Sequence, residues 1–421
     1  MRKIFIMTIS FLFAPVLAAE IPLQTAIEKG LQRAANFQNG ILEEKSRELE
    51  KRTAQMEKYF SIASGGSYLF KSEQIEVPFP GMSIYAGAKH NFDMNLSLKQ
   101  PIFIGNILTH SIRAAEIQLA IAQNQTSMEK IEIAAKIKSS YFNSLLLLNK
   151  KKSLDTLLRQ LNLHLKKIED FYIEELVKKT DLLETRRKIR EQEINIEDLN
   201  HLIVSEKIHF EKLCGLDIDI IDTGSTEKVG NYQKAFTDLK KNHPVLKTLD
   251  DRIALFSTCS KIVKGEYLPQ IALFAELHYG KPGIDFFKNQ WGFYFQGGIS
   301  FNFKLFDWNK KKRQLTLQDY AVKKKVNQRN DFILEGEKHL KQLFDAQRSV
   351  KRKMEILDNL VQLAEEDAQL KAGLYREQQV SNIDYLDALC TKERYVSKKN
   401  ELKMQLELIK VGINRVIGKG I

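Results

Sequence analysis

Cysteine, proline and glycine are scarce in this chain of 421 residues, which contains 3 Cys, 8 Pro and 21 Gly. So few cysteines exclude a disulfide-rich scaffold, and the low Pro and Gly content excludes a low-complexity protein. With 43% hydrophobic residues, the chain is also too apolar to be disordered. After the first 18 residues no uncharged apolar run approaches the ~20 residues of a membrane-spanning helix, which excludes a polytopic helical membrane protein.

The N-terminus has the pattern of a secretory signal. Met1-Arg2-Lys3 is a short positive region, followed by the apolar run 4–17 and by small residues that fit a cut after Ala18 or Ala19. An N-terminal membrane anchor is the alternative, but the apolar run is short and ends in a cleavable site. We therefore expect residues 1–18 to be the signal peptide of an exported bacterial protein, whose net charge falls from +12 to +10 on cleavage.

Cys214, Cys259 and Cys390 are odd in number and widely spaced. Each lies within a helix-like stretch. We expect them to be packing residues or free thiols rather than a disulfide framework.

The 109 residues between Gly105 and Gly215 contain neither Gly nor Pro, which is far longer than an ordinary helix. Apolar residues recur there at heptad spacing, which predicts a coiled-coil hairpin. We expect the reversal at residues 178–181, where Thr180 can cap the returning helix. The first arm, roughly 105–172, would be about 100 Å long. Its seam is Leu154, Leu158, Leu161, Leu165, Ile168 and Tyr172, and the returning seam is Ile189, Ile196, Leu199, Ile203, Phe210 and Leu213.

Four stretches alternate between apolar and polar or small residues with a period of two: 59–70, 92–99, 273–279 and 291–304. Such alternation over 7 to 14 residues, with terminal aromatics, fits transmembrane β-strands. A soluble antiparallel sheet with one buried face has the same pattern. The signal peptide, and the lack of another element to cover so aromatic a face, favour the membrane.

Shifting the sequence by 203 residues superposes its halves. Leu96-Ser97-Leu98 falls on Ile299-Ser300-Phe301, and Leu213-Cys214-Gly215 falls on Val416-Ile417-Gly418. The first repeat, 19–216, is predicted to hold a helix, a β-hairpin at 59–103 and a helical hairpin at 105–215. A linker at 217–242 joins it to the second repeat, 243–421, with a β-hairpin at 267–306 and a helical hairpin at 308–418.

Four strands cannot close a membrane barrel, because about eight is the minimum. An open sheet edge cannot exist in lipid, since its backbone groups would go unpaired. The barrel must therefore be shared between chains, and the sequence predicts an oligomer.

The motifs between these elements resemble those of the TolC-like outer-membrane efflux protein family over nearly the whole mature chain. They are Gln100-Pro101-Ile102-Phe103-Ile104-Gly105, Asn242-His243-Pro244, Tyr267-Leu268-Pro269 and Phe306-Asp307-Trp308-Asn309. The resemblance implies a mainly α fold with a β-barrel portion: a homotrimer with a shared 12-stranded barrel in the bacterial outer membrane and an α-helical barrel in the periplasm. It also implies a passive exit duct, without catalytic site or cofactor, that works with a periplasmic adaptor and an inner-membrane transporter.

The resemblance assigns the closable periplasmic end to the two hairpin tips, where the family carries a Val-Gly-x turn. The matching stretches are 174–181 and 377–384, in which Glu175 and Gln378 replace the tip glycine. An Arg often found in the family is Val380 here. The residues expected at the docking tips are Leu176, Val177, Thr180, Val380 and Ser381.

Asp384 and Asp387 match the family's constricting aspartates, while Tyr375 and Asp181 match polar residues that tie the closed tip together. Threefold symmetry would place the two aspartates in carboxylate rings that set the resting aperture and its cation preference. The alternative is that Asp384 only caps its helix and Asp387 is a solvated first-turn acid.

No spacing of His, Cys, Asp or Glu indicates a metal site, and no catalytic motif is present. The basic runs 150–152, 310–313 and 323–325 lack interleaved aromatics and are expected to be solvated helix faces rather than nucleic-acid sites. Residues 310–313 could also attract anionic lipid or cargo just below the membrane strands. The sequence of a passive duct does not identify its substrate, which could be small toxic compounds or a secreted protein. The alternative function is an exported soluble coiled-coil scaffold; a periplasmic adaptor is disfavoured because it needs no duplicated aromatic membrane hairpins.

Overall fold

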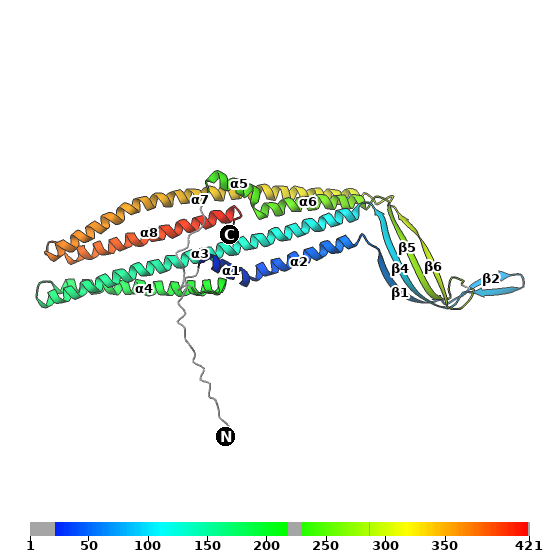
Figure 1. Cartoon of the computed structure of the whole chain (residues 1–421), viewed down its shortest axis with the longest axis horizontal. Coiled ribbons are helices and arrows are strands. Elements are labelled where there is room, and N and C mark those ends of the chain that lie inside the picture. The colour runs from blue at the N-terminus through cyan, green and yellow to red at the C-terminus, as the bar shows by residue number, and fades with distance from the viewer. Residues whose placement is uncertain (1–21, 218–228, 286, 420–421) are drawn as a thin grey trace, which may run out of the picture. The chain divides into compact units, whose positions relative to one another are not determined.

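The computed structural model describes residues 22–217, 229–285 and 287–419. The expected signal peptide, 1–18, and residues 218–228 of the expected linker lie outside the described residues. The described elements are long helices and two antiparallel sheets (Figure 1). The chain divides into two compact units, one with the described residues of 1–39, 127–243 and 333–421, the other with residues 40–126 and 244–332.

Two helices of equal length dominate the chain. α3 (Ile107–Ile173) and α7 (Lys310–Arg376) each contain 67 residues. α3 is followed by α4 (Lys179–Cys214), and α7 by α8 (Asn382–Val416). The long helical hairpins expected from the sequence are therefore confirmed.

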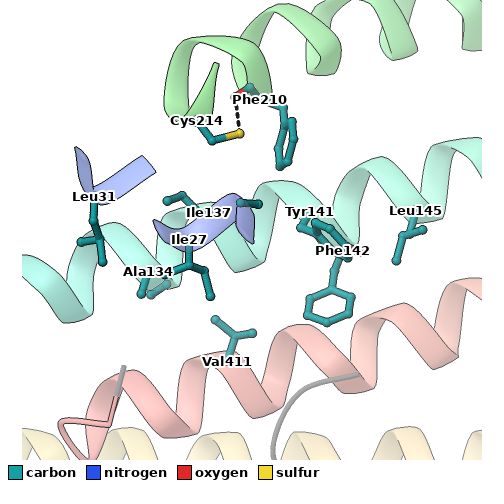
Figure 2. Close-up of a cluster of buried hydrophobic side chains, with 12 residues drawn as sticks. Ile27, Leu31, Ala134, Ile137, Tyr141, Phe142, Leu145, Phe210, Cys214 and Val411 are labelled. Carbon is teal, nitrogen blue, oxygen red and sulfur yellow. Dashed lines mark hydrogen bonds between the residues drawn. The ribbon is translucent and has the colours of Figure 1, made fainter. Parts of the chain in front are cut away.

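A core cluster of the first unit contains side chains from four helices (Figure 2). Ile27 of α1 (Leu23–Arg33) lies against α3, whose Tyr141 and Phe142 are fully buried with their ring centroids 5.8 Å apart. Phe210 of α4 and Val411 of α8 complete the cluster. Burying one such side chain contributes about 1.5–3 kcal/mol, so this cluster fastens both hairpins and the N-terminal helix together.

The cysteines are free, as expected. Cys214 is buried in the core cluster, and its thiol donates a hydrogen bond to the carbonyl of Phe210 at 3.1 Å (Figure 2). Burial is the main reason why its pKa is raised. This thiol is a packing residue.

The buried stripe of α3 differs from the predicted seam. Leu161 and Ile168 are buried as expected, but Leu157 and His164 are buried where Leu158 and Leu165 were predicted. Leu158 and Leu165 are only partly buried beside the neighbouring cluster. The stripe is wider than a two-position seam because α3 packs against more than one helix.

The predicted linker 217–242 ends in a helix that its turn formers did not indicate. α5 (Tyr232–Asn242) begins where the Asn231 side chain accepts a hydrogen bond from the Lys234 N–H at 3.0 Å. Ala235 and Leu239, four residues apart and so on one face, are buried. Capping and this short apolar face suffice for a helix of three turns.

The second unit contains a four-stranded antiparallel sheet in the order β1-β4-β5-β6. In the chain, β1 and β4 follow α2 (Ala35–Met56), and β5 and β6 follow α6 (Pro244–Gly265). The strands are β1 (Ser61–Phe70), β4 (His90–Ile104), β5 (Gln270–Lys281) and β6 (Gly292–Asn302). All four predicted strands are therefore present.

One face of this sheet is apolar and exposed. Leu96 of β4 pairs with Leu277 of β5, which pairs with Phe295 of β6. Phe295 and Ile299 are 68% and 67% exposed, so nothing within the unit covers them. Soluble proteins rarely leave a contiguous apolar face of this kind open.

The loop expected between the first two strands contains a second hairpin, β2 (Ile75–Phe79) and β3 (Met82–Ala86). Its turn includes Gly81, with a φ of +89°. Pro78 interrupts the strand pattern, which is why the alternation did not reveal it.

The two halves repeat their backbone at the offset of 203 that the sequence indicates. Glu175 and Gln378 have φ of +58° and +56°, and Asn106 and Asn309 both have φ of +60°. α3 and α7 begin and end at the same offset. Among the described residues, none of the helices is long and apolar enough to cross a membrane.

Candidate functional site at the hairpin tips

The first hairpin tip closes α3 with a Schellman turn. The Leu176 N–H donates to the Phe171 carbonyl at 2.9 Å, and the Glu175 N–H donates to the Tyr172 carbonyl at 3.1 Å. In this motif the residue with left-handed backbone is usually glycine. Here it is Glu175.

The second tip repeats this geometry at the end of α7. The Gln379 N–H donates to the Leu374 carbonyl at 2.9 Å, and the Gln378 N–H donates to the Tyr375 carbonyl at 3.1 Å. Gln378 takes the left-handed position. A side chain there costs about 1–2 kcal/mol relative to glycine, so the replacement of both tip glycines stores local strain.

The helices that return from the tips begin with capping boxes, in which an aspartate at the third helical position accepts a hydrogen bond from the backbone N–H of the cap residue. The Ser381 N–H donates to Asp384 Oδ2 at 3.3 Å, and the Asp384 N–H donates to Ser381 Oγ at 3.2 Å, which forms a capping box. At the first tip the Lys178 N–H donates to Asp181 Oδ2 at 3.2 Å. The prediction that Thr180 caps α4 is therefore wrong. A Thr180 cap would start the helix at Asp181, whereas α4 begins two residues earlier, at Lys179, with Lys178 as its cap.

The two predicted constriction aspartates differ in environment. Asp384 is engaged in its capping box, and the hydrogen bonds that the Ser381 hydroxyl and N–H donate to its carboxylate hold its pKa below the usual range. The Asp387 side chain is 62% exposed, and its Oδ1 lies 3.5 Å from Lys188 Nζ of α4. Asp387 is thus the freer of the two carboxylates.

Tyr375 and Asp181 are not joined by a hydrogen bond. The Tyr375 hydroxyl is buried and has no hydrogen-bond partner among the described residues. Burial, followed by the nearby charge of Asp181, raises the pKa of Tyr375 to about 12. The phenol is therefore neutral and available as a donor.

A polar network that the sequence did not indicate connects the hairpins beside Tyr375. His164 Nε2 of α3 lies 2.7 Å from Asn382 Oδ1 at the start of α8. Asn382 Nδ2 donates to the Asp181 carbonyl and to Thr185 Oγ1 of α4, each at 3.2 Å. Because the amide nitrogen of Asn382 donates, its oxygen accepts, which assigns the proton to His164 Nε2.

Aromatic rings surround this network. The His164 ring centroid lies 4.8 Å from that of Tyr385 and 5.3 Å from that of Tyr375. His164 and Asn382 are 5% and 2% exposed. Burial is the main cause of the lowered pKa of His164, and the charge of Lys167 lowers it further, whereas the hydrogen bond to Asn382 Oδ1 acts in the opposite direction.

His164 occupies a core position between Leu161 and Ile168, where the heptad spacing predicts Leu165. A histidine at a buried helical position needs a polar partner. The signal that could have revealed the network was therefore a lone His in the apolar stripe.

The predicted docking residues lie around the two turns. Leu176 is 51% exposed, and Thr180 and Ser381 are also exposed. Val177 and Val380 are half-buried. The structure thus leaves both tips accessible, with an apolar side chain at the outermost turn of the first.

The opposite face of the sheet carries a second polar cluster. His278 Nδ1 lies 3.0 Å from Asp93 Oδ1, and Gln296 Nε2 donates to Glu276 Oε2 at 2.6 Å. The His278 ring stacks on Tyr294 at 4.6 Å. Among the described residues, no group of three or more His, Cys, Asp or Glu is arranged to hold a metal ion.

The fold is that of known outer-membrane channels. The outer membrane protein VceC from Vibrio cholerae matches with a TM-score of 0.75 and 15% identity, over 94% of this chain and 96% of that chain. The Campylobacter jejuni CmeC outer membrane channel matches with a TM-score of 0.74 and 12% identity, over 95% and 86%. The open state of the Neisseria gonorrhoeae MtrE outer membrane channel matches with a TM-score of 0.74 and 11% identity, over 97% and 93%.

No protein-family model matches the chain, and no curated protein matches it in sequence. The mainly α fold with a β portion that the resemblance implies is thus confirmed by structural similarity alone.

Proposed function

We propose that this chain, which shares its fold with outer-membrane channels, is the outer-membrane exit duct of a tripartite efflux or type I secretion system. The observation that carries the proposal is the four-stranded sheet. Its apolar face is exposed, and in the described part of the chain β1 pairs only with β4 and β6 only with β5. An apolar face of this kind is stable against the lipid of a bilayer. The edges at β1 and β6 are not, because their unpaired backbone N–H and C=O groups would lie in lipid.

Both requirements are met if three copies share one barrel. Each copy supplies four strands, so that β6 of one copy pairs with β1 of the next and no edge remains. Twelve strands lie within the range of membrane barrels. The protein would then be a homotrimer in the bacterial outer membrane, with its helical hairpins in the periplasm.

The tips are the part of this duct that is suited to closing. The network of His164, Asn382 and Thr185 fastens the start of α8 to the first hairpin. Asp387 on α8 presents a solvent-exposed carboxylate one turn further on. We infer that the network fixes the resting position of α8 and that Asp387, with Asp384, lines the resting aperture.

Such a duct has no energy source of its own. It would take its substrate from an inner-membrane transporter through a periplasmic adaptor that meets the tips, at Leu176, Val177, Thr180, Val380 and Ser381. Whether that substrate is a small compound or a protein depends on the transporter.

Extraction and electrophoresis test the membrane assignment. We expect the protein to leave the outer-membrane fraction only with detergent and to migrate as a trimer that dissociates on heating. A water-soluble monomer would instead support the coiled-coil scaffold.

Site-directed crosslinking tests the partners. A photocrosslinking residue at Leu176 should capture an adaptor that co-purifies with its transporter. The matched control is Leu363 on α7, which is 62% exposed but lies away from the turns. Capture from both positions alike would argue against a docking site at the tips.

A further inference from the structure

Positive charge is concentrated where β6 leads into α7. Residues 304–325 contain eight Lys and Arg but only two acids, Asp307 and Asp319. The first turn of α7 has no acidic residue. Cations at a helix N-terminus oppose the helix dipole, so the stability of α7 does not explain the run Lys310–Arg313.

Exposed apolar side chains lie next to these cations. In the connector between β6 and α7, Leu305, Phe306 and Trp308 are 86%, 74% and 78% exposed. The Phe306 and Trp308 rings meet edge to face with centroids 5.0 Å apart. They follow directly on the exposed apolar residues of β6. Aromatic side chains at the end of a membrane strand belong at the level of the lipid headgroups.

The connector is held in place by Asp307. Asp307 Oδ2 accepts the Lys311 N–H at 2.7 Å, and a hydrogen bond with Asp307 raises the pKa of Tyr267 to about 12. The ammonium groups of Lys304 and Lys311 lie 5.4 and 5.0 Å from the Tyr267 ring centroid. Both ammonium groups thus lie over the Tyr267 ring, just before β5 begins.

The cations that follow are not neutralised within the chain. Among the described residues, Lys310, Lys311 and Lys312 make no ion pair, and Arg313 Nη1 donates to the Trp308 carbonyl at 2.8 Å. Lys304 makes only a long contact, 3.8 Å, with Glu266. These side chains can therefore accept an external anion.

We propose that this surface binds the phosphate headgroups of anionic phospholipids in the leaflet where β6 leaves the membrane. We call it the basic collar and define it as Lys304, Phe306, Trp308 and Lys310–Arg313. It rests on the proposed function, because it requires the sheet to lie in a bilayer. The aromatic rings lie among the headgroups while the cations bind the phosphates, and each cation near an anionic surface strengthens attachment.

A neighbouring copy is the other candidate for this surface, since β6 is an edge strand. It would bring its own α2 and β1. Residues 35–58, however, contain equal numbers of acids and bases. Arg47 already pairs with Glu43 and Glu50, and Arg52 with Glu48. That segment has no net negative charge for the collar, so charge complementarity favours lipid.

The tryptophans provide a direct probe, because Trp291 and Trp308 are the only two in the chain. In a Trp291→Phe variant, fluorescence reports Trp308 alone. The purified full-length protein would be reconstituted into phosphatidylcholine vesicles with a minor fraction of lipid brominated near the headgroup. This brominated lipid is either phosphatidylglycerol or phosphatidylcholine. We expect brominated phosphatidylglycerol to quench Trp308 more strongly than brominated phosphatidylcholine. High salt should remove this excess quenching.

Charge variants in this background locate the effect. Lys310→Gln, Lys311→Gln, Lys312→Gln and Arg313→Gln together should abolish the excess, since each cation contributes roughly fivefold in lipid affinity. The matched control is Lys323→Gln, Lys324→Gln and Lys325→Gln, further along α7, which should keep it. Trimeric migration of both variants checks that they fold.

Equal quenching by the two brominated lipids would overturn the proposal while leaving the membrane assignment intact. Equal loss in the control variant would also overturn it, because the effect would then be a general surface potential. If an inserted trimer is quenched by neither lipid, Trp308 faces another copy and the collar is a subunit contact. A chain that does not enter the vesicles at all would refute the proposed function itself.

Discussion

At the tips, one buried histidine decides how the second hairpin is attached to the first. His164 holds Asn382, and Asn382 in turn holds Thr185 and the Asp181 carbonyl. The equivalent positions in the other half, 203 residues away, are Asp367 and Lys179, which cannot form the same contact. The attachment therefore belongs to one side of the repeat only.

Replacing His164 with Ala should loosen the tips. The change leaves Asn382 Oδ1 buried without a donor, which costs roughly 1–3 kcal/mol. We expect a higher open probability in planar bilayer recordings. His201→Ala, on an exposed position of α4, is the matched control and should gate normally. Identical gating of the two variants would show that the network does not hold the closed state.

The network should also respond to pH. The groups around His164 are Lys167 on its own helix, Thr185 and the Asp181 carbonyl of α4, Tyr375 of α7, and Asn382 and Tyr385 of α8. None of these side chains carries a negative charge that would favour protonation of the imidazole. Its lowered pKa means that the neutral form is favoured in the folded state.

The stability that this supplies is fully present above the ordinary His pKa of about 6.5 and is lost as pH falls below it. We therefore expect open probability to rise on acidification in the wild type. The rise should be absent in His164→Gln, which keeps a donor for Asn382 but does not titrate. A rise of the same size in His164→Gln would assign the effect to another group.

Strain at the turns gives a prediction of opposite sign. Glu175→Gly and Gln378→Gly place glycine at left-handed φ, so each should stabilise the protein by about 1 kcal/mol. A higher midpoint of thermal unfolding would show this. Gln379→Gly, one residue further and without positive φ, should lower the midpoint. A decrease in all three variants would mean that the tip side chains matter more than their backbone strain.

The residue types at the turns were readable from the sequence because their conformation depends on local contacts. The family resemblance placed Glu175 and Gln378 at the tip-glycine positions, where the structure has left-handed backbone. Asp384 was considered as a possible cap, and the structure makes it the partner of the cap residue Ser381. The partner of His164 was not predictable. Asn382 lies 218 residues away, and only packing of the two hairpins brings the side chains together.

At the scale of elements, the junction between α6 and α3 depends on two glycines. A Cβ on Gly105 would lie 2.2 Å from the Gly265 carbonyl oxygen, and one on Gly265 would lie 2.4 Å from the Gly105 oxygen. Gly105 also has a φ of +65°. Backbone meets backbone here, so no side-chain movement can relieve the clash.

Gly105→Ala should therefore destabilise the protein by about 3 kcal/mol or more, because both a clash and a strained φ are introduced. The matched control is Gly373→Ala in α7, where a Cβ meets nothing within 4 Å. That change should stabilise by roughly 1 kcal/mol through helix propensity. Thermal unfolding of the two variants measures both effects, and similar midpoints would contradict the close approach.

The long helices and the four strands were predictable because their periodicity extends over many residues. Short elements, and elements whose sequence pattern is interrupted, were not predictable. α5 depends on one cap and two buried side chains, and the β2–β3 hairpin is broken by Pro78. The start of α4 was misassigned to a Thr180 cap because the Asp181 carboxylate serves Lys178 instead.

At the scale of the whole molecule, the positive charge that the composition left unexplained has a location. The surplus of six charges in residues 304–325 is half of the total of +12. The sequence indicated that residues 310–313 could contact anionic lipid or cargo, but it did not distinguish the two. The exposure of Phe306 and Trp308 and the position of Tyr267, which favour lipid, are visible only in the structure. The strand count predicted an oligomer, and the family resemblance predicted a trimer. The sheet edges at β1 and β6, which have no further partner among the described strands, support the trimer that we propose.

Conductance of the purified trimer in planar bilayers tests whether the protein is a channel that is narrowed at its hairpin tips. We expect discrete cation-preferring openings in the wild type. Asp387→Asn should reduce that preference more than Asp384→Asn, because Asp387 is exposed while Asp384 is engaged in its capping box. The double variant should change both conductance and ion preference. If the double variant conducts as the wild type does, with the same ion preference, the aspartates do not form the aperture; if no openings occur at all, the protein is not a channel.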